Sequence, residues 1–144
     1  MDLPEQRIVD FIGEHHILTL AVVKDHVPYC ATCYYAYLPA QNLFVFSSGH
    51  ETRHIRDVVE GGNFTVAGAI ALETKIVGKI RGIQMNGMIR ELEGDELKKA
   101  RTAYLKRFPI ARLMPNLTLW MLAPDFIKMT DNRLGFGKKL VWRV

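Results

Sequence analysis

The pattern of apolar and polar positions predicts a chain built mainly of short strands. Runs rich in β-branched and aromatic residues, each bounded by Gly, Pro, Asn or Asp, are typical of strands joined by tight turns. Such runs are present at 17–23, 29–38, 43–46, 64–72, 76–92, 117–122 and 126–129. Gly78, Gly82 and Gly87 lie inside the longest run, and glycine within a strand indicates a bulge or a sharp bend. We therefore predict a strongly curved sheet.

Apolar residues spaced three to four positions apart predict a smaller number of helices. The segments are 4–14, a short one that begins after Thr52, 93–108 and a single turn at 110–114. We expect Thr52 to cap the short helix, and Ile55, Val58 and Val59 to share its buried face. Regular helices do not separate the strands, which argues against a parallel sheet of β-α-β units. The predicted fold class is mainly β, an antiparallel barrel of six to seven strands with flanking helices, in a single domain over 1–144.

Composition narrows the class of protein without naming a function. The 144 residues are 49% hydrophobic and 24% charged, which is ordinary for a globular domain. The formal net charge of +4 suits a small anionic ligand and also a weak attraction to nucleic acid. No apolar run approaches the ~20 residues that span a bilayer, the first residues are acidic, and two cysteines make no disulfide framework. We expect a cytoplasmic protein with no membrane partner.

The stretch after the third predicted strand carries the chemistry. Phe46 ends an apolar run, and a Ser-Ser-Gly turn then leads into the short helix. The first turn of a helix leaves backbone N–H groups without internal partners. Three hydroxyls, a guanidinium and an imidazole surround it, in Ser47, Ser48, Thr52, Arg53 and His54. Because a phosphate dianion needs such amides, hydroxyls and cations, the stretch predicts a phosphate-binding corner. The alternative is an ordinary polar turn with a solvated arginine.

A second pattern, Cys30-x2-Cys33 followed by His50-x3-His54, has the residue types of a zinc site. The sixteen residues between the two pairs lie just outside the usual zinc-finger interval. Because side chains alternate faces along a strand, two cysteines three positions apart point in opposite directions. We therefore interpret both as buried structural thiols. The sequence also lacks the Gly-x-Ser-x-Gly nucleophile motif, the Gly-x4-Gly-Lys-Ser/Thr phosphate loop and the Gly-x-Gly-x-x-Gly dinucleotide signature.

Three segments together resemble a known superfamily. They are Phe44-Val45-Phe46-Ser47-Ser48, Thr52-Arg53-His54 and Lys79-Ile80-Arg81-Gly82-Ile83-Gln84-Met85-Asn86-Gly87. The combination looks like the FMN-binding split barrel of the pyridoxamine 5′-phosphate oxidase-like superfamily. More narrowly, segments 107–112 and 130–139, the second of which contains Leu-Gly-Phe-Gly-Lys-Lys, are similar to the YhbP family. That family is a bacterial group of predicted flavin-binding proteins without an assigned reaction, and the similarity covers nearly the whole chain.

The resemblance implies a homodimer with two FMN molecules at its interface. Thr52 and Arg53 match the Ser/Thr-Arg-Lys element that grips the FMN phosphate in the superfamily, and His54 stands where lysine is usual. Because histidine is only partly charged near neutrality, we expect FMN retention to weaken as the pH rises through roughly 6–8. The oxidase carries an arginine on its second strand, whereas 30–33 contains none. Oxidation of pyridoxamine phosphate is therefore not expected.

The other cofactor contacts follow from the same resemblance. The flavin ring in such barrels rests mainly against the backbone of the second and third strands. By that analogy, the ring would be lined by Thr32, Cys33, Tyr34, Phe46 and Ser47. Gln84 is the polar contact expected from the long strand. The residues expected to approach from the partner subunit are Lys138, Lys139 and Trp142.

Two classes of function remain open, with a third behind them. The leading hypothesis is an FMN-dependent oxidoreductase acting on an unknown small molecule, in which the cofactor transfers the electrons. The alternative is a non-enzymatic flavin- or heme-binding module that stores or senses its ligand, because no catalytic acid or base is evident. The third is a zinc or nucleic-acid-binding module, which the cysteine–histidine pattern and the basic charge would favour.

Overall fold

Seven antiparallel strands form one continuous sheet in the computed structural model, which describes residues 2–144. The strands are β1 (Ile17–Lys24), β2 (Val27–Leu38), β3 (Leu43–Ser47), β4 (Thr65–Ala71), β5 (Arg81–Glu91), β6 (Leu119–Asp131) and β7 (Lys139–Arg143). The helices are α1 (Gln6–Glu14), α2 (Arg53–Gly61) and α3 (Gly94–Arg107), with short 3-10 turns η1 (Val77–Lys79), η2 (Pro109–Leu113) and η3 (Asn132–Leu134). Within 2–144, each helix falls short of the length and hydropathy that crossing a membrane requires.

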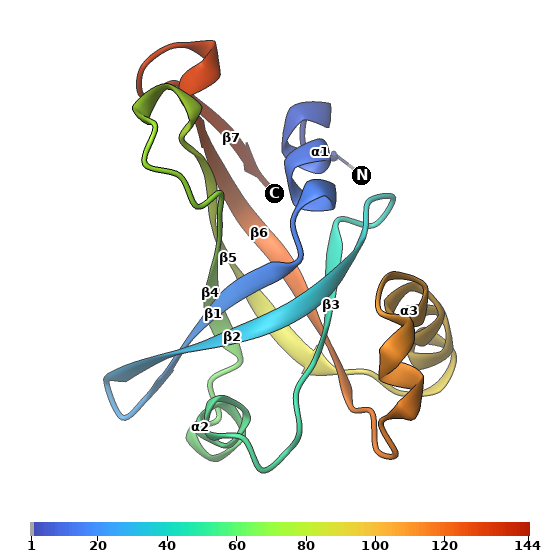
Figure 1. Ribbon diagram of the computed structural model, residues 1–144. Helices are drawn as coiled ribbons and strands as arrows, with labels where there is room; N and C mark the ends of the chain where they lie inside the picture. Colours follow the sequence, from blue (N-terminus) through green and yellow to red (C-terminus); the bar gives the residue numbers. More distant parts are fainter. Residues whose placement is uncertain (1) are drawn as a thin grey trace.

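The sheet closes on itself and so becomes a barrel. Its strand order is β3-β2-β1-β4-β5-β6-β7, and β3 pairs with β6 as well as with β2. Six strands therefore form a closed ring, and β7 extends the sheet from β6. In Figure 1 the barrel lies between α1 at one end and α2 at the other, with α3 against its outside. The predicted mainly β, antiparallel barrel is confirmed.

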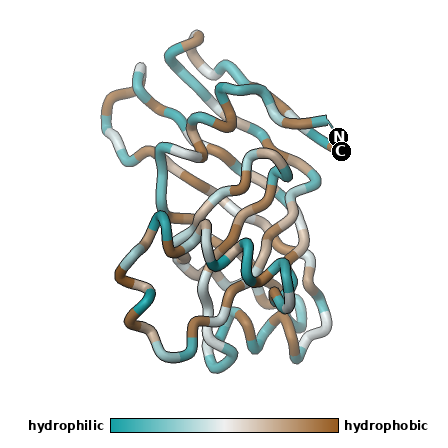
Figure 2. Tube along the Cα trace, turned by 90° about the vertical axis from the view of Figure 1, so that its right-hand side faces the viewer, coloured by the Kyte–Doolittle hydropathy of each residue, from teal (hydrophilic) through white to brown (hydrophobic). Residues whose placement is uncertain are grey.

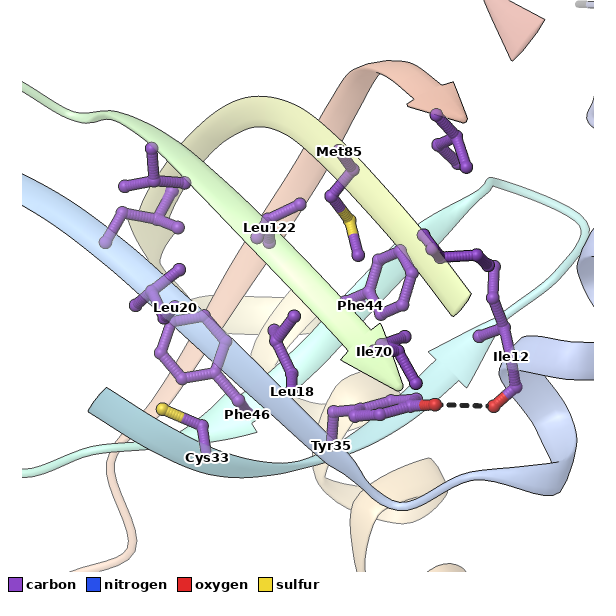
Figure 3. Packing of buried hydrophobic residues seen from close by; sticks show 14 of the residues in the cluster. Ile12, Leu18, Leu20, Cys33, Tyr35, Phe44, Phe46, Ile70, Met85 and Leu122 are labelled. Carbon is purple, nitrogen blue, oxygen red and sulfur yellow. Dashed lines mark hydrogen bonds between the residues drawn. The ribbon is translucent and has the colours of Figure 1, made fainter. Parts of the chain in front are cut away.

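Side chains alternate between the two faces of each strand, and the inward-facing ones form the barrel core. Leu18, Leu20 and Val22 of β1 are fully buried, whereas the residues between them face outward. At one end of the core, the Tyr35 hydroxyl donates a 2.6 Å hydrogen bond to the Ile12 carbonyl oxygen of α1 (Figure 3). A buried hydroxyl without a partner would be costly, so this bond both permits the burial of Tyr35 and fixes α1 on the barrel.

A second apolar cluster lies outside the barrel wall, beneath α3. It joins Ala100, Tyr104 and Leu105 of the helix to outward-facing residues of the wall such as Val45 and Met121. The helix predicted over 93–108 is confirmed, and Ala100, Tyr104 and Leu105 are its buried residues. α3 therefore covers one part of the outside, over β2, β3 and β6.

α2 closes the opposite end of the barrel. Ile55 and Val58 are buried in the barrel core, and the helix ends at Gly62, whose φ of 66° is the left-handed conformation that suits glycine. Val59 is 53% exposed, so its predicted place on the buried face is wrong. It lies about 100° further around the helix axis than Val58, beyond the stripe that contacts the core.

Two predicted strand boundaries differ from the observed elements, and β7 was not among the predicted strands. The two short runs predicted near the end of the chain form one strand, β6, which continues through Pro124. The strand accommodates this proline because its register with β5 shifts between Asn86 and Gly87. The first part of the longest predicted run is the turn η1, and β5 begins only at Arg81.

Candidate functional site

The chain leaves the barrel at the end of β3, where the predicted phosphate-binding corner lies. The β2–β3 ladder stops at the Tyr35–Phe46 pair, although β2 goes on pairing with β1 as far as Val27. β3 instead follows β6, with Ser47 opposite Leu119. β2 and β3 therefore separate, and the turn that leads to α2 starts beside the gap between them (Figure 1).

Ser48 holds this turn to the barrel through all of its polar groups. Its backbone N–H donates to the Thr118 carbonyl oxygen at 3.2 Å, and its own carbonyl oxygen accepts from Trp120 Nε1 at 3.0 Å. Its hydroxyl lies 2.7 Å from His54 Nε2 and 3.9 Å from the Cys33 sulfur. Ser48 and His54 are both buried. The turn is thus a fixed structure and differs from an ordinary solvated loop.

Thr52 precedes α2, as expected, but its side chain does not cap the helix. Its hydroxyl donates instead to the Gly49 carbonyl oxygen at 2.8 Å, inside the turn. The first hydrogen bond of the helix runs from the Arg56 N–H to the Thr52 carbonyl oxygen at 3.0 Å. The N–H groups of 53–55 consequently have no capping side chain. Together with the helix dipole, they favour a negative charge in front of α2.

Arg53 opens α2 and supplies the positive charge of the corner. Its guanidinium carbon lies 4.0 Å from the centre of the Tyr29 ring, and its Nε lies 3.4 Å from Asp57 Oδ2. Half of the side chain is exposed, so the guanidinium remains accessible to a ligand. Neither neighbour was among the residues predicted for the corner. The i,i+4 spacing of Arg53 and Asp57 could have indicated the second contact, whereas Tyr29 belongs to β2 and is found only from the folded register.

His54 occupies a different place from the one predicted. Its side chain is 9% exposed and is directed to Ser48 inside the protein. Burial lowers the pKa of His54, and the Asp57 carboxylate offsets this only in part. An imidazole with a lowered pKa is neutral at pH 7. The structure therefore gives no support to a positively charged His54 beside Arg53.

The residues expected to line a flavin ring divide between two faces of the sheet. Cys33 and Phe46 point into the barrel core and are buried, so only their backbone could contact a ligand (Figure 3). Burial raises the pKa of the Cys33 thiol, and a nearby hydroxyl works against this. Thr32 and Tyr34 are exposed on the outer face, and Ser47 is half-buried at the end of β3. Side-chain contacts with a ring are thus restricted to the outward-facing pair and Ser47.

The residues of the zinc pattern have no common centre. Cys30 is exposed and Cys33 is buried, because they lie on opposite faces of β2. The interpretation as a buried thiol is confirmed for Cys33 and is wrong for Cys30. His50 pairs with Glu91 at 2.5 Å, and His54 is engaged in the turn. Among the residues that the structure describes, no three His, Cys, Asp or Glu side chains are grouped to hold a metal ion.

Gln84 lies on the same outer face as Thr32. Cross-strand partners connect the two in one row, which runs Thr32, Thr19, Ala69, Gln84 across β2, β1, β4 and β5. With about 4.8 Å between neighbouring strands, the row is roughly 14 Å long. Thr19, Ala69 and Gln84 line a depression of about 340 Å³. The small side chains allow a flat body to approach the sheet closely here.

The three residues expected from a partner subunit lie at the other end of the barrel. Lys138 and Lys139 are exposed after η3, and Figure 1 places this loop far from α2. Lys139 Nζ donates to the Gly137 carbonyl oxygen at 3.1 Å. Trp142 packs inward and donates from Nε1 to the Asp2 carbonyl oxygen at 3.2 Å, and Figure 2 shows the segment before α1 beside the C-terminal strand. Within one chain these residues do not join the corner, and their contact with a cofactor stays a prediction.

Known bacterial proteins resemble the chain along most of their length, although no protein-family model matches it. A UPF0306 protein of Klebsiella pneumoniae is 41% identical over 133 residues, which are 92% of this chain and 88% of that protein. The UPF0306 protein YhbP of Escherichia coli O157:H7 is 39% identical over 132 residues, again 92% of this chain and 88% of the relative.

Solved structures share the fold at low sequence identity. A heme-binding protein from Mycobacterium smegmatis has a TM-score of 0.77 and 19% identity over 92% of this chain, which spans 55% of that protein. The heme storage protein HutZ from Vibrio cholerae has a TM-score of 0.67 and 20% identity, over 85% of this chain and 91% of HutZ. An FAD-binding protein from Mesorhizobium loti has a TM-score of 0.69 and 17% identity, over 86% of this chain and 90% of that protein. These likenesses show the split-barrel fold, and the identity to its sequence relatives shows that the chain belongs to the UPF0306 family, the family of YhbP.

Proposed function

We propose that this protein binds FMN and transfers electrons through it. The observation that carries the proposal is the corner in front of α2, where uncapped N–H groups and the exposed Arg53 guanidinium lie beside the gap between β2 and β3. A phosphate monoester carries close to two negative charges at neutral pH. Backbone N–H groups at a helix start and an arginine are donors that suit such a group.

The ring system of a flavin fits next to the corner. Where β2 and β3 separate, the backbone of 32–34 has a strand neighbour on one side only, and Ser47 is paired with β6 alone. Free backbone groups at this gap can bond to the polar edge of a planar ring. We assign the phosphate to Arg53 and the first turn of α2, and the ring to the gap. Bound flavin supplies the electron transfer, while the chain holds and orients it.

A second copy of the chain completes the site in this proposal. Ile17, Tyr34 and Met88 are 46, 56 and 56% exposed on the outer face of the sheet. Ile17 and Tyr34 are a cross-strand pair on one side of the row from Thr32 to Gln84, and Met88 lies on its other side, so a monomer leaves apolar side chains in water on both sides of the row. We assign Lys138 and Lys139 of that second copy to the cofactor, because their positive charge suits an anionic group.

Heme is the second candidate ligand. It is favoured by the fold shared with a heme-binding protein and a heme storage protein. Heme iron is held by a protein side chain, and the exposed imidazoles of His16, His26 and His50 would be the candidates to hold it. A protein that only stores or senses such a ligand would also need no catalytic acid or base.

Titration of ligand-free protein with FMN, followed by flavin fluorescence, tests the corner. Arg53→Ala should weaken FMN binding by at least ~10-fold, because a hydrogen bond to a charged group contributes about 1.5–3 kcal/mol. Arg101→Ala is the matched control, since Arg101 is an exposed arginine on α3, and it should leave the affinity unchanged. Unaltered affinity of Arg53→Ala would contradict the assigned corner. Binding of heme with an intense Soret band, and no binding of FMN, would select the second candidate.

Stopped-flow spectroscopy separates an oxidoreductase from a passive carrier. In the FMN-loaded protein, NADH or NADPH should bleach the flavin faster than it bleaches free FMN, and a small-molecule acceptor should restore the colour. Bound flavin that is reduced no faster than free FMN would assign the protein to storage or sensing.

A further inference from the structure

His54 and Ser48 form a buried link between α2 and the barrel wall. The Ser48 backbone is bonded on both sides to the segment that opens β6, through Thr118 and Trp120. Its hydroxyl lies 2.7 Å from the imidazole of His54, the second residue of α2. The two residues are 7 and 9% exposed. The link therefore ties the start of α2 to β6 across the turn at 49–52.

We propose that His54 is a positioning residue, which acts through Ser48 to hold the start of α2 where it binds an anion and does not itself contact the anion. The inference rests on the proposed function, because the anion is the phosphate of FMN. A second bond, from the Thr52 hydroxyl to the Gly49 carbonyl oxygen, fixes the turn internally. With both bonds formed, the N–H groups of the first turn and Arg53 keep one position relative to the β2–β3 gap. Such preorganisation removes the ordering cost from ligand binding.

The surroundings of His54 favour its neutral form. From α2, the charged group that acts on it is the Asp57 carboxylate. From the turn before α2 it meets the Ser48 hydroxyl, which in turn lies next to the Cys33 thiol of β2, and the Trp120 indole of β6 is bonded to the same turn. A proton on the imidazole would place a charge among these uncharged groups, at a cost that Asp57 offsets only in part.

The protonation state of His54 therefore decides whether the link holds. Acid should draw the imidazole out of its buried position, loosen the turn and weaken anion binding. A histidine in contact with the phosphate would behave in the opposite way, since its positive charge would strengthen binding at low pH. The sign of the pH dependence thus separates a positioning residue from a ligand of the phosphate.

The test compares the wild type with His54→Gln by FMN fluorescence titration between pH 5 and 8. Glutamine can keep a hydrogen bond to Ser48 but does not titrate. The FMN phosphate itself takes up a proton near pH 6, and because this affects both proteins alike, the ratio of their Kd values isolates His54. The ratio of wild-type to variant Kd should rise about threefold or more from pH 7.5 to pH 5, and Ser48→Ala should raise Kd about three- to tenfold at pH 7.5.

Two results of the titration would overturn the inference. A ratio that stays flat between pH 5 and 8 would mean that the protonation of His54 has no influence on the corner. A ratio that falls toward acid would show that His54 is a charged ligand of the phosphate.

Hydrogen exchange in the ligand-free protein separates this inference from the proposed function. If wild type binds no FMN at any pH, the proposed function fails, but the link can still be measured. The bonded amides of Thr52 and Arg56 should exchange faster in Ser48→Ala than in the wild type at pH 7. After correction for intrinsic rates, exchange of these amides in the wild type at pH 5 should be nearly as fast as in the Ser48→Ala variant. Thr102→Ala, which removes a hydroxyl bonded to the Lys98 carbonyl oxygen in α3, should leave both amides unchanged. Equal exchange in Ser48→Ala and wild type would overturn the positioning role.

Discussion

Asp131 is completely buried at the end of β6 and nevertheless keeps its negative charge. Its carboxylate accepts hydrogen bonds from Nε, Nη2 and the backbone N–H of Arg133 at 3.0–3.1 Å, and from Arg7 Nη1 at 3.4 Å. The bonds from Arg133 outweigh desolvation and hold the pKa of Asp131 below its usual range. One carboxylate thereby joins α1 to the η3 turn.

Asp131→Asn should lower the free energy of unfolding at pH 7 by about 1–3 kcal/mol in urea denaturation, because charged hydrogen bonds are lost. The pKa of Asp131 is lower in the folded protein than in the unfolded chain. Its charge therefore stabilises the fold above about pH 4, and this contribution is lost as the pH falls further. The difference between wild type and variant should accordingly shrink below about pH 4.

The control for this substitution is Asp125→Asn, at an exposed aspartate of the same strand. It should change the free energy of unfolding by less than about 0.5 kcal/mol. Equal losses in the two variants would contradict the role given to the buried carboxylate.

At the scale of single residues, the sequence predicts those positions that depend only on neighbouring residues. The place of Arg53 at the start of α2, directly after Thr52, follows from neighbouring positions. The direction of the His54 side chain does not, because Ser48 is held by Trp120, 72 residues further along the chain. The Thr52 hydroxyl can serve either the helix or the turn, and only the folded geometry of the turn decides between the two.

β5 and β6 share a long ladder that depends on a glycine. Their register shifts between Asn86 and Gly87, opposite Pro124. A Cβ on Gly87 would lie 2.4 Å from the Ala123 carbonyl oxygen and 2.9 Å from the Cα of Pro124. Glycine is required at this position because the β6 backbone approaches closely. The φ of Gly87 is not in the left-handed region and so does not require glycine.

Gly87→Ala should lower the free energy of unfolding by about 1–3 kcal/mol, because the added methyl group overpacks the bulge. Urea denaturation measures the change. Gly78→Ala is the matched control: a Cβ there meets nothing within 4 Å, and Gly78 lacks a left-handed φ. The urea concentration at the midpoint of unfolding should be the same for Gly78→Ala as for the wild type. If Gly87→Ala did the same, the bulge would have relaxed and the requirement for glycine would be wrong.

Most elements could be predicted from the sequence, and the exceptions have physical reasons. Proline usually ends a strand, so the pattern divides β6 at Pro124, whereas the bulge lets the strand continue. Residues 76–80 contain three β-branched apolar residues and read as strand, yet Ile76 and Ile80 are 50 and 38% exposed next to η1. An apolar run alone does not show whether a neighbouring strand is there to pair with it.

The outer face of the whole molecule exposes several apolar side chains. α3 covers one part of it, and the remainder exposes Ile17 and Tyr34 on one side of the row from Thr32 to Gln84 and Met88 on the other. Specific protein interfaces bury about 1,200–2,000 Å² in total, and contiguous apolar patches on small proteins commonly mark a binding surface. We expect two copies of the chain to pair over this face.

Ala69→Arg should convert the expected dimer into a monomer. Ala69 faces outward in the middle of the small-residue row, so arginine can extend into solvent in the monomer but would clash with a partner. Sedimentation equilibrium should give two copies of the 16.4 kDa chain for the wild type and one for the variant, with weaker FMN binding. Thr102→Arg, at an exposed position of α3, should remain a dimer. A monomeric wild type, or a dimeric Ala69→Arg, would contradict this interface.

The barrel could be predicted at the scale of the molecule, but its point of closure could not. Short turns favour antiparallel neighbours such as β1 and β2. The pairing of β3 with β6 joins segments far apart in sequence, such as Ser47 and Leu119, and the pattern of either strand does not specify its partner. The corner depends on that pairing. The residues of the candidate site could therefore be predicted from the sequence, whereas their arrangement in space could not.

The separation of β2 from β3 leaves one flank of β2 without a neighbouring strand between Val27 and Tyr34. Extended peptides add to a sheet at such flanks, and aggregation of β proteins starts there as well. A planar guest seated against this flank would block both. A bound ligand would then also protect the folded protein from aggregation through this flank.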